Sequence, residues 1–217
     1  SAVVDMYIKC SFMVEAHRVF ERLPICDVVS WTSLVVGYTE HGHGEEALQC
    51  LEAMNQRGIP WNVVTYMSAL KACGLIKDVK KGQEIHGDVI KKGFESDIHI
   101  DNTLIHMYID SKLLETAEDI FERCYVRDSV SWSILTSGYA AHGLFEEVVY
   151  CYERMQHEGT VPHGAMYVLS FKACGSIKDE EKGREIHHQV IMNGFDGEVL
   201  VGSALVDMYV KISSLSE

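Results

Sequence analysis

Three consecutive residues, His43, Gly44 and Glu45, match the H-x-E arrangement of zinc-dependent nucleobase deaminases. In that chemistry the histidine binds zinc, the glutamate transfers protons, and a P-C-x-x-C sequence supplies two further ligands. No P-C-x-x-C follows in this chain, so a metal ion at His43 would lack its other ligands. We therefore predict no catalytic residue and no metal site, and we do not expect the chain to be an enzyme.

Two further patterns occur at the same place. Residues 42–47 fit the loosest form of the glycine-rich dinucleotide-binding sequence, but they lie between two helical segments rather than after a strand. His41 and His43 are close enough in sequence to share a metal ion, yet no further ligands accompany them. A solvated turn between two helices explains both patterns better, and we expect no cofactor.

The composition restricts the class of protein. The formal net charge of −13 over 217 residues argues against nucleic-acid binding, because phosphate contacts require lysine and arginine. No apolar run has the length of a membrane span. The number of cysteines is odd and several recur at equivalent positions, which indicates small buried thiols in a reducing compartment. They are Cys10, Cys26, Cys50, Cys73, Cys124, Cys151 and Cys174.

The chain repeats itself at a spacing of 101 residues. Residues 29–31, Val-Ser-Trp, recur at 130–132, and residues 71–74, Lys-Ala-Cys-Gly, recur at 172–175. Self-similarity at a fixed period is typical of stacked units that cannot bury their apolar faces alone. We therefore predict an all-α fold, an α-solenoid of helix-turn-helix repeats.

Helical spacing of apolar residues divides the first full block into three hairpins, residues 28–62, 63–97 and 98–128. The expected helices are residues 29–40 with 45–56, about 64–73 with about 80–91, and 102–109 with 114–123. Six aromatic residues at burial-prone positions are predicted to belong to the core rather than to a surface that stacks on bases. These are Trp31, Trp132, Tyr38, Tyr139, Tyr108 and Tyr209. His86 and His187 are likewise expected to be packing residues.

Several sequences in these hairpins resemble a known repeat family. Residues 27–31 with 44–48, residues 70–73 with 82–86, and residues 102–108 with 117–121 resemble the P, L and S motifs of plant pentatricopeptide repeat (PPR) proteins of the PLS subclass. The resemblance covers the whole chain and implies a right-handed superhelix. It implies these motif boundaries: 1–27 partial S, 28–62 P, 63–97 L, 98–128 S, 129–163 P, 164–198 L and 199–217 partial S.

In that family the fifth and the last residue of each motif read one RNA base. Carried onto this sequence, the pairs are Ser1 with Asp27, Thr32 with Asn62, Met67 with Asp97, Asn102 with Asp128, Ser133 with His163, and Val168 with Glu198, while Ser203 has no partner in the chain. By the family's code the first, second and fourth pairs resemble readers of G, A and U. The other three depart from the common code, so the implied site is 5′-G-A-N-U-N-N.

The second residue of each motif wedges between bases in the family. The candidates here are Val29, Val64, His99, Val130, Ala165 and Leu200. Apolar or aromatic side chains at these positions can contact the faces of unstacked bases. The alternative is that these residues only begin helices.

The resemblance implies sequence-specific binding of single-stranded RNA, as the recognition part of a mitochondrial or chloroplast RNA-processing factor, with C-to-U RNA editing as the expected process. It also implies protein editing cofactors that dock on the L motifs, with catalysis outside these residues. The alternative class is a protein-protein interaction scaffold of helical repeats, which tolerates acidic charge. The acidic residues concentrate in the second helix of each hairpin, which would leave RNA facing the nearly uncharged first helices.

Overall fold

The structure is a computed structural model that describes residues 2–23 and 26–214. Within these residues the chain forms thirteen α-helices and no strand, which confirms the all-α prediction. The chain divides into two compact units, residues 1–125 and 126–217, and each unit is described by itself.

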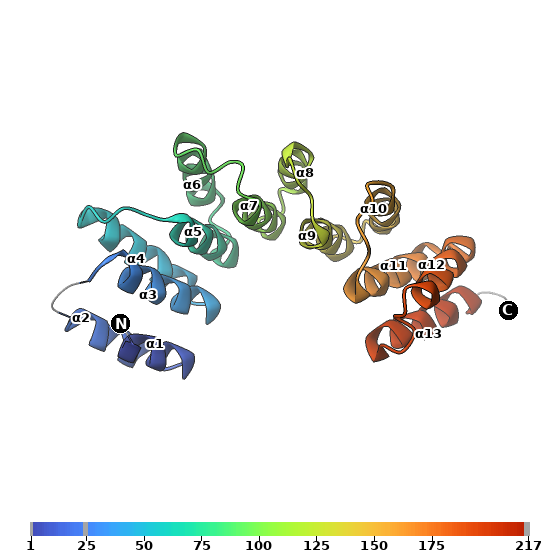
Figure 1. Ribbon diagram of the computed structural model, residues 1–217, viewed down its shortest axis with the longest axis horizontal. Helices are drawn as coiled ribbons and strands as arrows, with labels where there is room; N and C mark the ends of the chain where they lie inside the picture. Colours follow the sequence, from blue (N-terminus) through green and yellow to red (C-terminus); the bar gives the residue numbers. More distant parts are fainter. Residues whose placement is uncertain (1, 24–25, 215–217) are drawn as a thin grey trace. The chain divides into compact units, whose positions relative to one another are not determined.

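The first unit contains four helical hairpins. Its helices are α1 (Ala2–Lys9), α2 (Met13–Glu21), α3 (Val28–Glu40), α4 (Gly44–Gln56), α5 (Val63–Ile76), α6 (Val79–Lys91), α7 (Ile98–Asp110) and α8 (Leu114–Arg123). The first helix of each hairpin packs on the first helix of the next, so that α1, α3, α5 and α7 form a continuous layer. Figure 1 shows α6 and α8 on one side of this layer.

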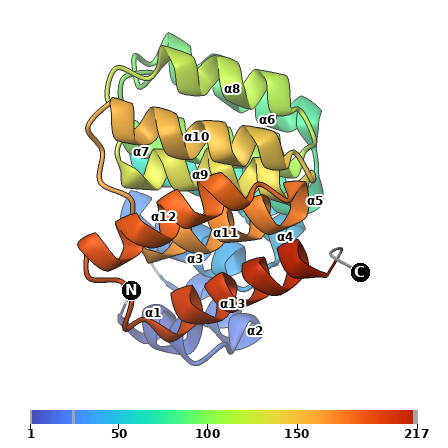
Figure 2. The same ribbon diagram turned by 90° about the vertical axis from the view of Figure 1, so that its right-hand side faces the viewer.

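The second unit repeats this arrangement with α9 (Ser129–Ala141), α10 (Phe145–His157), α11 (Gly164–Ile177), α12 (Glu180–Met192) and α13 (Val199–Ser213). Helix α11 packs on both α9 and α13, while α10 lies against α9 and α11. Figure 2 shows α10 running alongside α9. In both units the hairpins therefore stack in chain order, as the repeat period predicts.

Most predicted helices are present with small changes at their ends. The exception is the first helix of the third hairpin, which begins at Ile98 and not at Asn102 as expected. The Asp97 side chain accepts hydrogen bonds from the backbone N–H groups of His99 and Ile100, and these bonds start the helix one turn earlier. The helical spacing of apolar residues gave no sign of this extra turn, because Asp101 and Asn102 are polar.

The predicted aromatic core is confirmed for five of its six members. Trp31, Trp132, Tyr38, Tyr108 and Tyr139 are buried, whereas Tyr209 is half-buried. The expected packing role of the two L-motif histidines is also confirmed. The Nδ1 atom of His86 lies 3.0 Å from the hydroxyl of Tyr108, and His187 makes the equivalent contact with Tyr209 at 3.2 Å.

The cysteine prediction is correct in five cases and wrong in two. Cys50, Cys73, Cys124, Cys151 and Cys174 are buried free thiols, while Cys10 is exposed and Cys26 is half-buried. Burial raises the pKa of the Cys50 thiol to about 12, so this sulfur is a small apolar group at neutral pH. Cys10 lies in the turn after α1 and Cys26 in the connection before α3, so both are outside the helices.

Glycine permits close contact between successive hairpins at two equivalent places. A Cβ atom added to Gly82 on α6 would lie 2.8 Å from the sulfur of Met107 on α7, and one added to Gly183 on α12 would lie 2.6 Å from that of Met208 on α13. Any larger residue would push the methionine out of its site. These two glycines therefore allow α6 to lie close to α7, and α12 close to α13.

Candidate nucleic-acid interface

The residues predicted to end the motifs share one structural position. Each is the N-cap of the first helix of the next hairpin: Asp27 on α3, Asn62 on α5, Asp97 on α7, Asp128 on α9, His163 on α11 and Glu198 on α13. Five of these side chains accept a hydrogen bond from a backbone N–H of the first turn, and Glu198 accepts none. A predicted base reader thus also begins a helix.

Hydroxyl groups strengthen three of these caps. Oδ1 of Asp27 accepts from the backbone N–H of Ser30 at 2.9 Å and from its hydroxyl at 2.8 Å. Ser131 donates in the same way to Asp128, at 2.8 and 3.0 Å. The backbone N–H and then the hydroxyl of Ser30 lower the pKa of the Asp27 carboxyl, so it stays ionised at neutral pH. The cap therefore holds each carboxylate in a defined orientation.

The two residues expected to form the reading pair of the first P motif, Thr32 and Asn62, are joined through Thr65. Oγ1 of Thr32 lies 3.0 Å from Oγ1 of Thr65, which in turn donates to Oδ1 of Asn62 at 2.9 Å. Thr32 also donates to the carbonyl of Val28 at 2.7 Å. Thr65 was not singled out in the sequence, although Asn followed three residues later by Thr is a signal of a helix N-cap.

The reading pair of the second P motif is joined directly. Oγ of Ser133 lies 3.0 Å from Nε2 of His163, while Nδ1 of His163 accepts a long hydrogen bond of 3.4 Å from the backbone N–H of Met166. The sequence resemblance placed these two residues in one pair, and the structure brings their side chains into contact.

The remaining predicted readers are placed in different surroundings. Met67 and Val168 are half-buried on α5 and α11, and Ser203 is exposed on α13. The Glu198 carboxylate lies against Gly164, the first residue of α11, where a negative charge is favourable at a helix N-terminus. Ser1 lies outside the described residues. The partners Asn102 and Asp128 belong to different units and are described separately.

Asn102 is buried, with 8% of its surface exposed. No described protein group donates a hydrogen bond to its Oδ1 atom. Burying an amide oxygen without a donor costs free energy. A ligand that donates a hydrogen bond to Oδ1 of Asn102 would recover it.

All six predicted wedge residues are exposed, and each is the second residue of a first helix. The four aliphatic wedges longer than alanine are Val29, Val64, Val130 and Leu200, which are between 49% and 75% exposed. Each of these wedge residues comes two positions after a predicted reader that forms the N-cap of the same helix. Exposed apolar side chains that recur at one helical position are typical of a contact surface rather than of scattered surface residues.

Four of the first helices carry few charges. Across α3, α5, α9 and α11 the only charged residues are Glu40, Lys71 and Lys172. The acidic residues of the second helices are mostly exposed, as expected, with Glu118 and Asp179 half-buried. Most of the negative charge of each unit thus lies away from the predicted readers.

The two histidines of the turn between α3 and α4 contact different groups. His41 contacts the carbonyl of Gly37 at 2.8 Å and the hydroxyl of Ser11 at 3.0 Å, whereas His43 faces Glu46 at 3.9 Å. The described part of the chain has no group of three or more His, Cys, Asp and Glu side chains arranged to hold a metal ion. None of its helices is long and apolar enough to cross a membrane.

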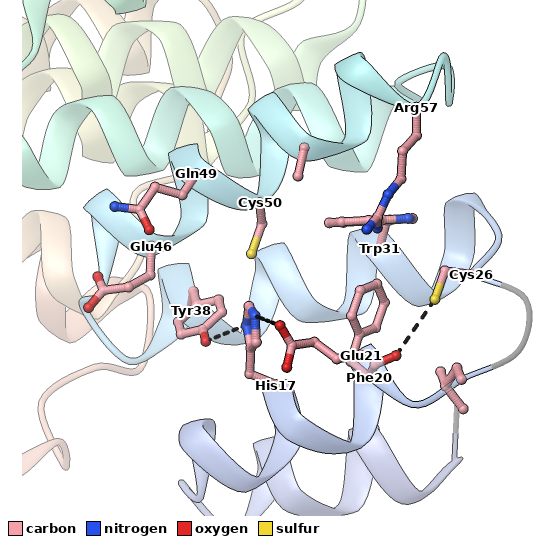
Figure 3. A pocket seen from close by; sticks show the side chains of 12 residues that line it. His17, Phe20, Glu21, Cys26, Trp31, Tyr38, Glu46, Gln49, Cys50 and Arg57 are labelled. Atoms are coloured by element: carbon pink, nitrogen blue, oxygen red, sulfur yellow. Dashed lines mark hydrogen bonds and ion pairs between the residues drawn. The ribbon is translucent and has the colours of Figure 1, made fainter.

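A cavity of about 680 Å³ in the first unit has no predicted reader among its lining residues. Figure 3 shows it between α2 and the α3–α4 hairpin, with His17 pointing toward Tyr38 and Arg57 beside Trp31. Nδ1 of His17 is 2.8 Å from the Tyr38 hydroxyl, and the Arg57 guanidinium lies 4.8 Å from the centre of the Trp31 ring. These polar side chains already contact one another, so the cavity is a packing gap between hairpins.

A second cavity of about 390 Å³ lies between α6, α7 and α8 and is lined by Asp101, Arg123 and Cys124 among others. Asp101 is 9% exposed. Burial raises the pKa of its carboxyl, while a hydrogen bond with Cys124 and the charge of Arg123 partly offset that effect. The equivalent residue one block later is Gly202.

Comparisons with known proteins agree with this architecture. The PPR repeat family matches residues 27–74, and the PPR repeat matches residues 102–125 and 130–160. A mitochondrial pentatricopeptide repeat-containing protein of Arabidopsis thaliana is 35% identical over 213 residues, which are 97% of this chain and 31% of that protein. A chloroplastic one from the same plant is 33% identical over 207 residues, 95% of this chain and 26% of that protein. The chain thus spans about a third or less of these relatives.

Among solved structures, the chain is similar to the pentatricopeptide repeat protein PPR10 from maize, with a TM-score of 0.73 at 19% identity over 97% of this chain and 31% of that one. It is equally similar, at 16% identity over 95% of this chain and 31% of the other, to PPR10 in complex with an 18-nucleotide psaJ RNA element. This likeness shows the fold, an α-solenoid of helical hairpins.

Proposed function

Because this chain carries repeats of the pentatricopeptide repeat family, we propose that it binds single-stranded RNA and reads one base with each repeat. The inferred target is 5′-G-A-N-U-N-N. The structural relative PPR10 has been solved with RNA bound, which supports the proposal without assigning the readers of this chain.

The hydrogen bonds that connect the two expected readers of each P motif, through Thr65 in the first and directly in the second, are the observation that carries the proposal. In the first pair the Oδ1 atom of Asn62 is taken up by Thr65, so the amide presents Nδ2–H as a donor. The hydroxyl proton of Thr32 is directed at Val28, so its oxygen presents lone pairs. A donor beside an acceptor complements the N1 and N6–H₂ groups of adenine, whereas guanine carries the reverse pattern, O6 and N1–H.

The finer features of the proposal rest on the resemblance. Motifs alternate as P, L and S with the boundaries 28–62, 63–97, 98–128, 129–163 and 164–198, flanked by partial S motifs at 1–27 and 199–217. The process served is C-to-U RNA editing in a mitochondrion or chloroplast, with protein editing cofactors on the L motifs. Relatives named mitochondrial and chloroplastic support an organelle but do not choose between the two.

The decisive experiment exchanges the donor of Asn62 for an acceptor. In an Asn62→Asp variant a carboxylate oxygen still caps α5, but the group facing the base accepts instead of donating. Binding at low salt is measured for RNAs with A or G at the second base of the inferred site. We expect the ratio of the two affinities to move toward G by about tenfold.

The matched control is Asn55→Asp on α4, an exposed residue away from the readers that adds the same negative charge. It should weaken both RNAs equally. If the wild-type chain binds no RNA, or if Asn62→Asp also changes both affinities equally, base reading by this pair is wrong. A protein-protein interaction scaffold is then the better function.

A further inference from the structure

The Thr65 side chain, which is 0% exposed, occupies the centre of the reading pair of the first P motif. Its Oγ1 atom lies 3.0 Å from Thr32, 2.9 Å from Oδ1 of Asn62 and 3.3 Å from the backbone nitrogen of Asn62. The Thr65 hydroxyl thus contacts Thr32 and Asn62, the fifth and last residues of the preceding motif. Thr65 itself is the third residue of the next motif.

The number of protons in this network restricts its polarity. The two hydroxyl groups carry one proton each, and these protons are shared among the Val28 carbonyl, Oδ1 of Asn62 and the oxygen of the other threonine. In the arrangement that the structure gives, Thr65 donates to Oδ1 of Asn62 and Thr32 donates to the Val28 carbonyl at 2.7 Å. Thr32 then faces a ligand as an acceptor, and Asn62 faces it as a donor.

The equivalent place in the second P motif lacks this bridge. Thr65 corresponds to Met166, which is buried and has no hydroxyl, and Asn62 corresponds to His163. Here the two readers, Ser133 and His163, bond to each other. The two copies of the block therefore differ at the third position in the way that their reading pairs are connected.

We propose that Thr65 is a positioning residue that determines specificity, because its hydroxyl holds Thr32 and Asn62 as one acceptor and one donor facing the base. This inference rests on the proposed function. The ligand group so recognised is a ring-nitrogen acceptor beside an amino donor on a Watson–Crick edge, which adenine presents at N1 and N6 and guanine lacks. Without the hydroxyl, the backbone N–H of residue 65 still donates to Oδ1 of Asn62, but the link between Thr32 and Asn62 is gone and their side chains move independently.

The test compares Thr65→Val, which keeps the side-chain shape, with Thr65→Ser, which restores the hydroxyl. Affinities are measured for RNAs carrying A or G at the second base. In Thr65→Val the preference for A over G should fall about fivefold, and Thr65→Ser should recover most of it. Thr39→Val is the matched control, because the buried Thr39 hydroxyl on α3 donates to Val35 within its own helix. It should leave the preference unchanged.

A reciprocal experiment transfers the network to the second P motif. His163→Asn with Met166→Thr should prefer A over G at the fifth base more strongly than His163→Asn alone, by about fivefold. This gain compares two variants that both keep Thr65, so the result does not depend on whether Thr65→Val destabilises α5.

The outcomes separate the two proposals. Wild-type chain without any A preference at the second base contradicts the proposed function. Two results together would overturn the role of Thr65 and leave base reading intact. The first is a preference for A over G that persists in Thr65→Val. The second is an equal preference in His163→Asn with and without Met166→Thr.

Discussion

Oγ of Ser133 and Nε2 of His163 lie 3.0 Å apart, so two residues assigned to one RNA base are bonded to each other. The corresponding residues of the first P motif, Thr32 and Asn62, are instead joined through Thr65. A base that enters the second site must compete with an existing hydrogen bond, whereas a base at the first site meets groups whose polarity is already set.

This difference predicts unequal sensitivity to RNA sequence. Replacing the second base of the inferred site, A, by G should reduce affinity by about fivefold or more, while replacing the fifth base by any other should change it by less than about threefold. Binding of a set of labelled single-stranded RNAs at one low salt concentration measures both. Equal sensitivity at the two positions would contradict the distinction drawn between the pairs.

The caps predict different costs of truncation. Asp128→Ala should destabilise the protein by about 1–2 kcal/mol, because the backbone N–H and hydroxyl of Ser131 lose their acceptor. Glu198→Ala should change stability by less than about 0.5 kcal/mol, since Glu198 makes no side-chain cap bond to α13. Urea unfolding of the two variants gives the comparison, and equal losses would show that the cap bonds are unimportant.

Two glycines of α6 predict effects of opposite sign. Gly82→Ala should cost about 1–3 kcal/mol, because its new Cβ overlaps Met107. Gly87→Ala should stabilise the protein by about 0.5–1 kcal/mol, since an added Cβ there meets no atom within 4 Å and alanine is the better helix former. Thermal unfolding of both variants tests this, and a stabilising Gly82→Ala would disprove the close contact with Met107.

Asp101 predicts a stability that depends on pH. Burial raises the pKa of its carboxyl above the unfolded value, so its favourable contribution is complete below the unfolded pKa and is lost as the pH rises through the folded pKa. Asp101→Asn should therefore stabilise the protein at pH 7, by on the order of 1 kcal/mol, and bring no gain at pH 3. Unfolding free energies at the two pH values are the measurement. A gain of the same size at both would exclude desolvation as its cause.

The wedge position predicts a loss of binding without a loss of stability. Val64 is 49% exposed, so Val64→Ala should leave the unfolding free energy within about 0.5 kcal/mol and yet weaken RNA binding several-fold through lost contact with a base face. Leu75→Ala, at the other end of α5 and similarly exposed, is the control and should affect neither. If Val64→Ala binds RNA like the wild type, Val64 only begins a helix.

Much of the fold follows from the sequence by itself. The 101-residue period, the helical spacing of apolar residues and the glycine turns determine hairpins and their core, because these signals act within one helix or between adjacent segments. The N-caps also follow a local rule, in which Asp or Asn is followed three residues later by Ser or Thr. The pairs are Asp27 with Ser30, Asn62 with Thr65 and Asp128 with Ser131. The start of α7 was missed because the polar residues Asp101 and Asn102 interrupt the apolar spacing near its beginning.

The connections across hairpins were decided only by the tertiary structure. Thr32 and Thr65 are 33 residues apart, and their contact depends on how α3 packs on α5. The same holds for the approach of Gly82 to Met107 and for the burial of Asp101 and Asn102. Local sequence determines where a helix begins and which side is apolar, but the pairing of polar groups depends on the distance and angle between packed helices, which arise from side-chain packing along the whole interface.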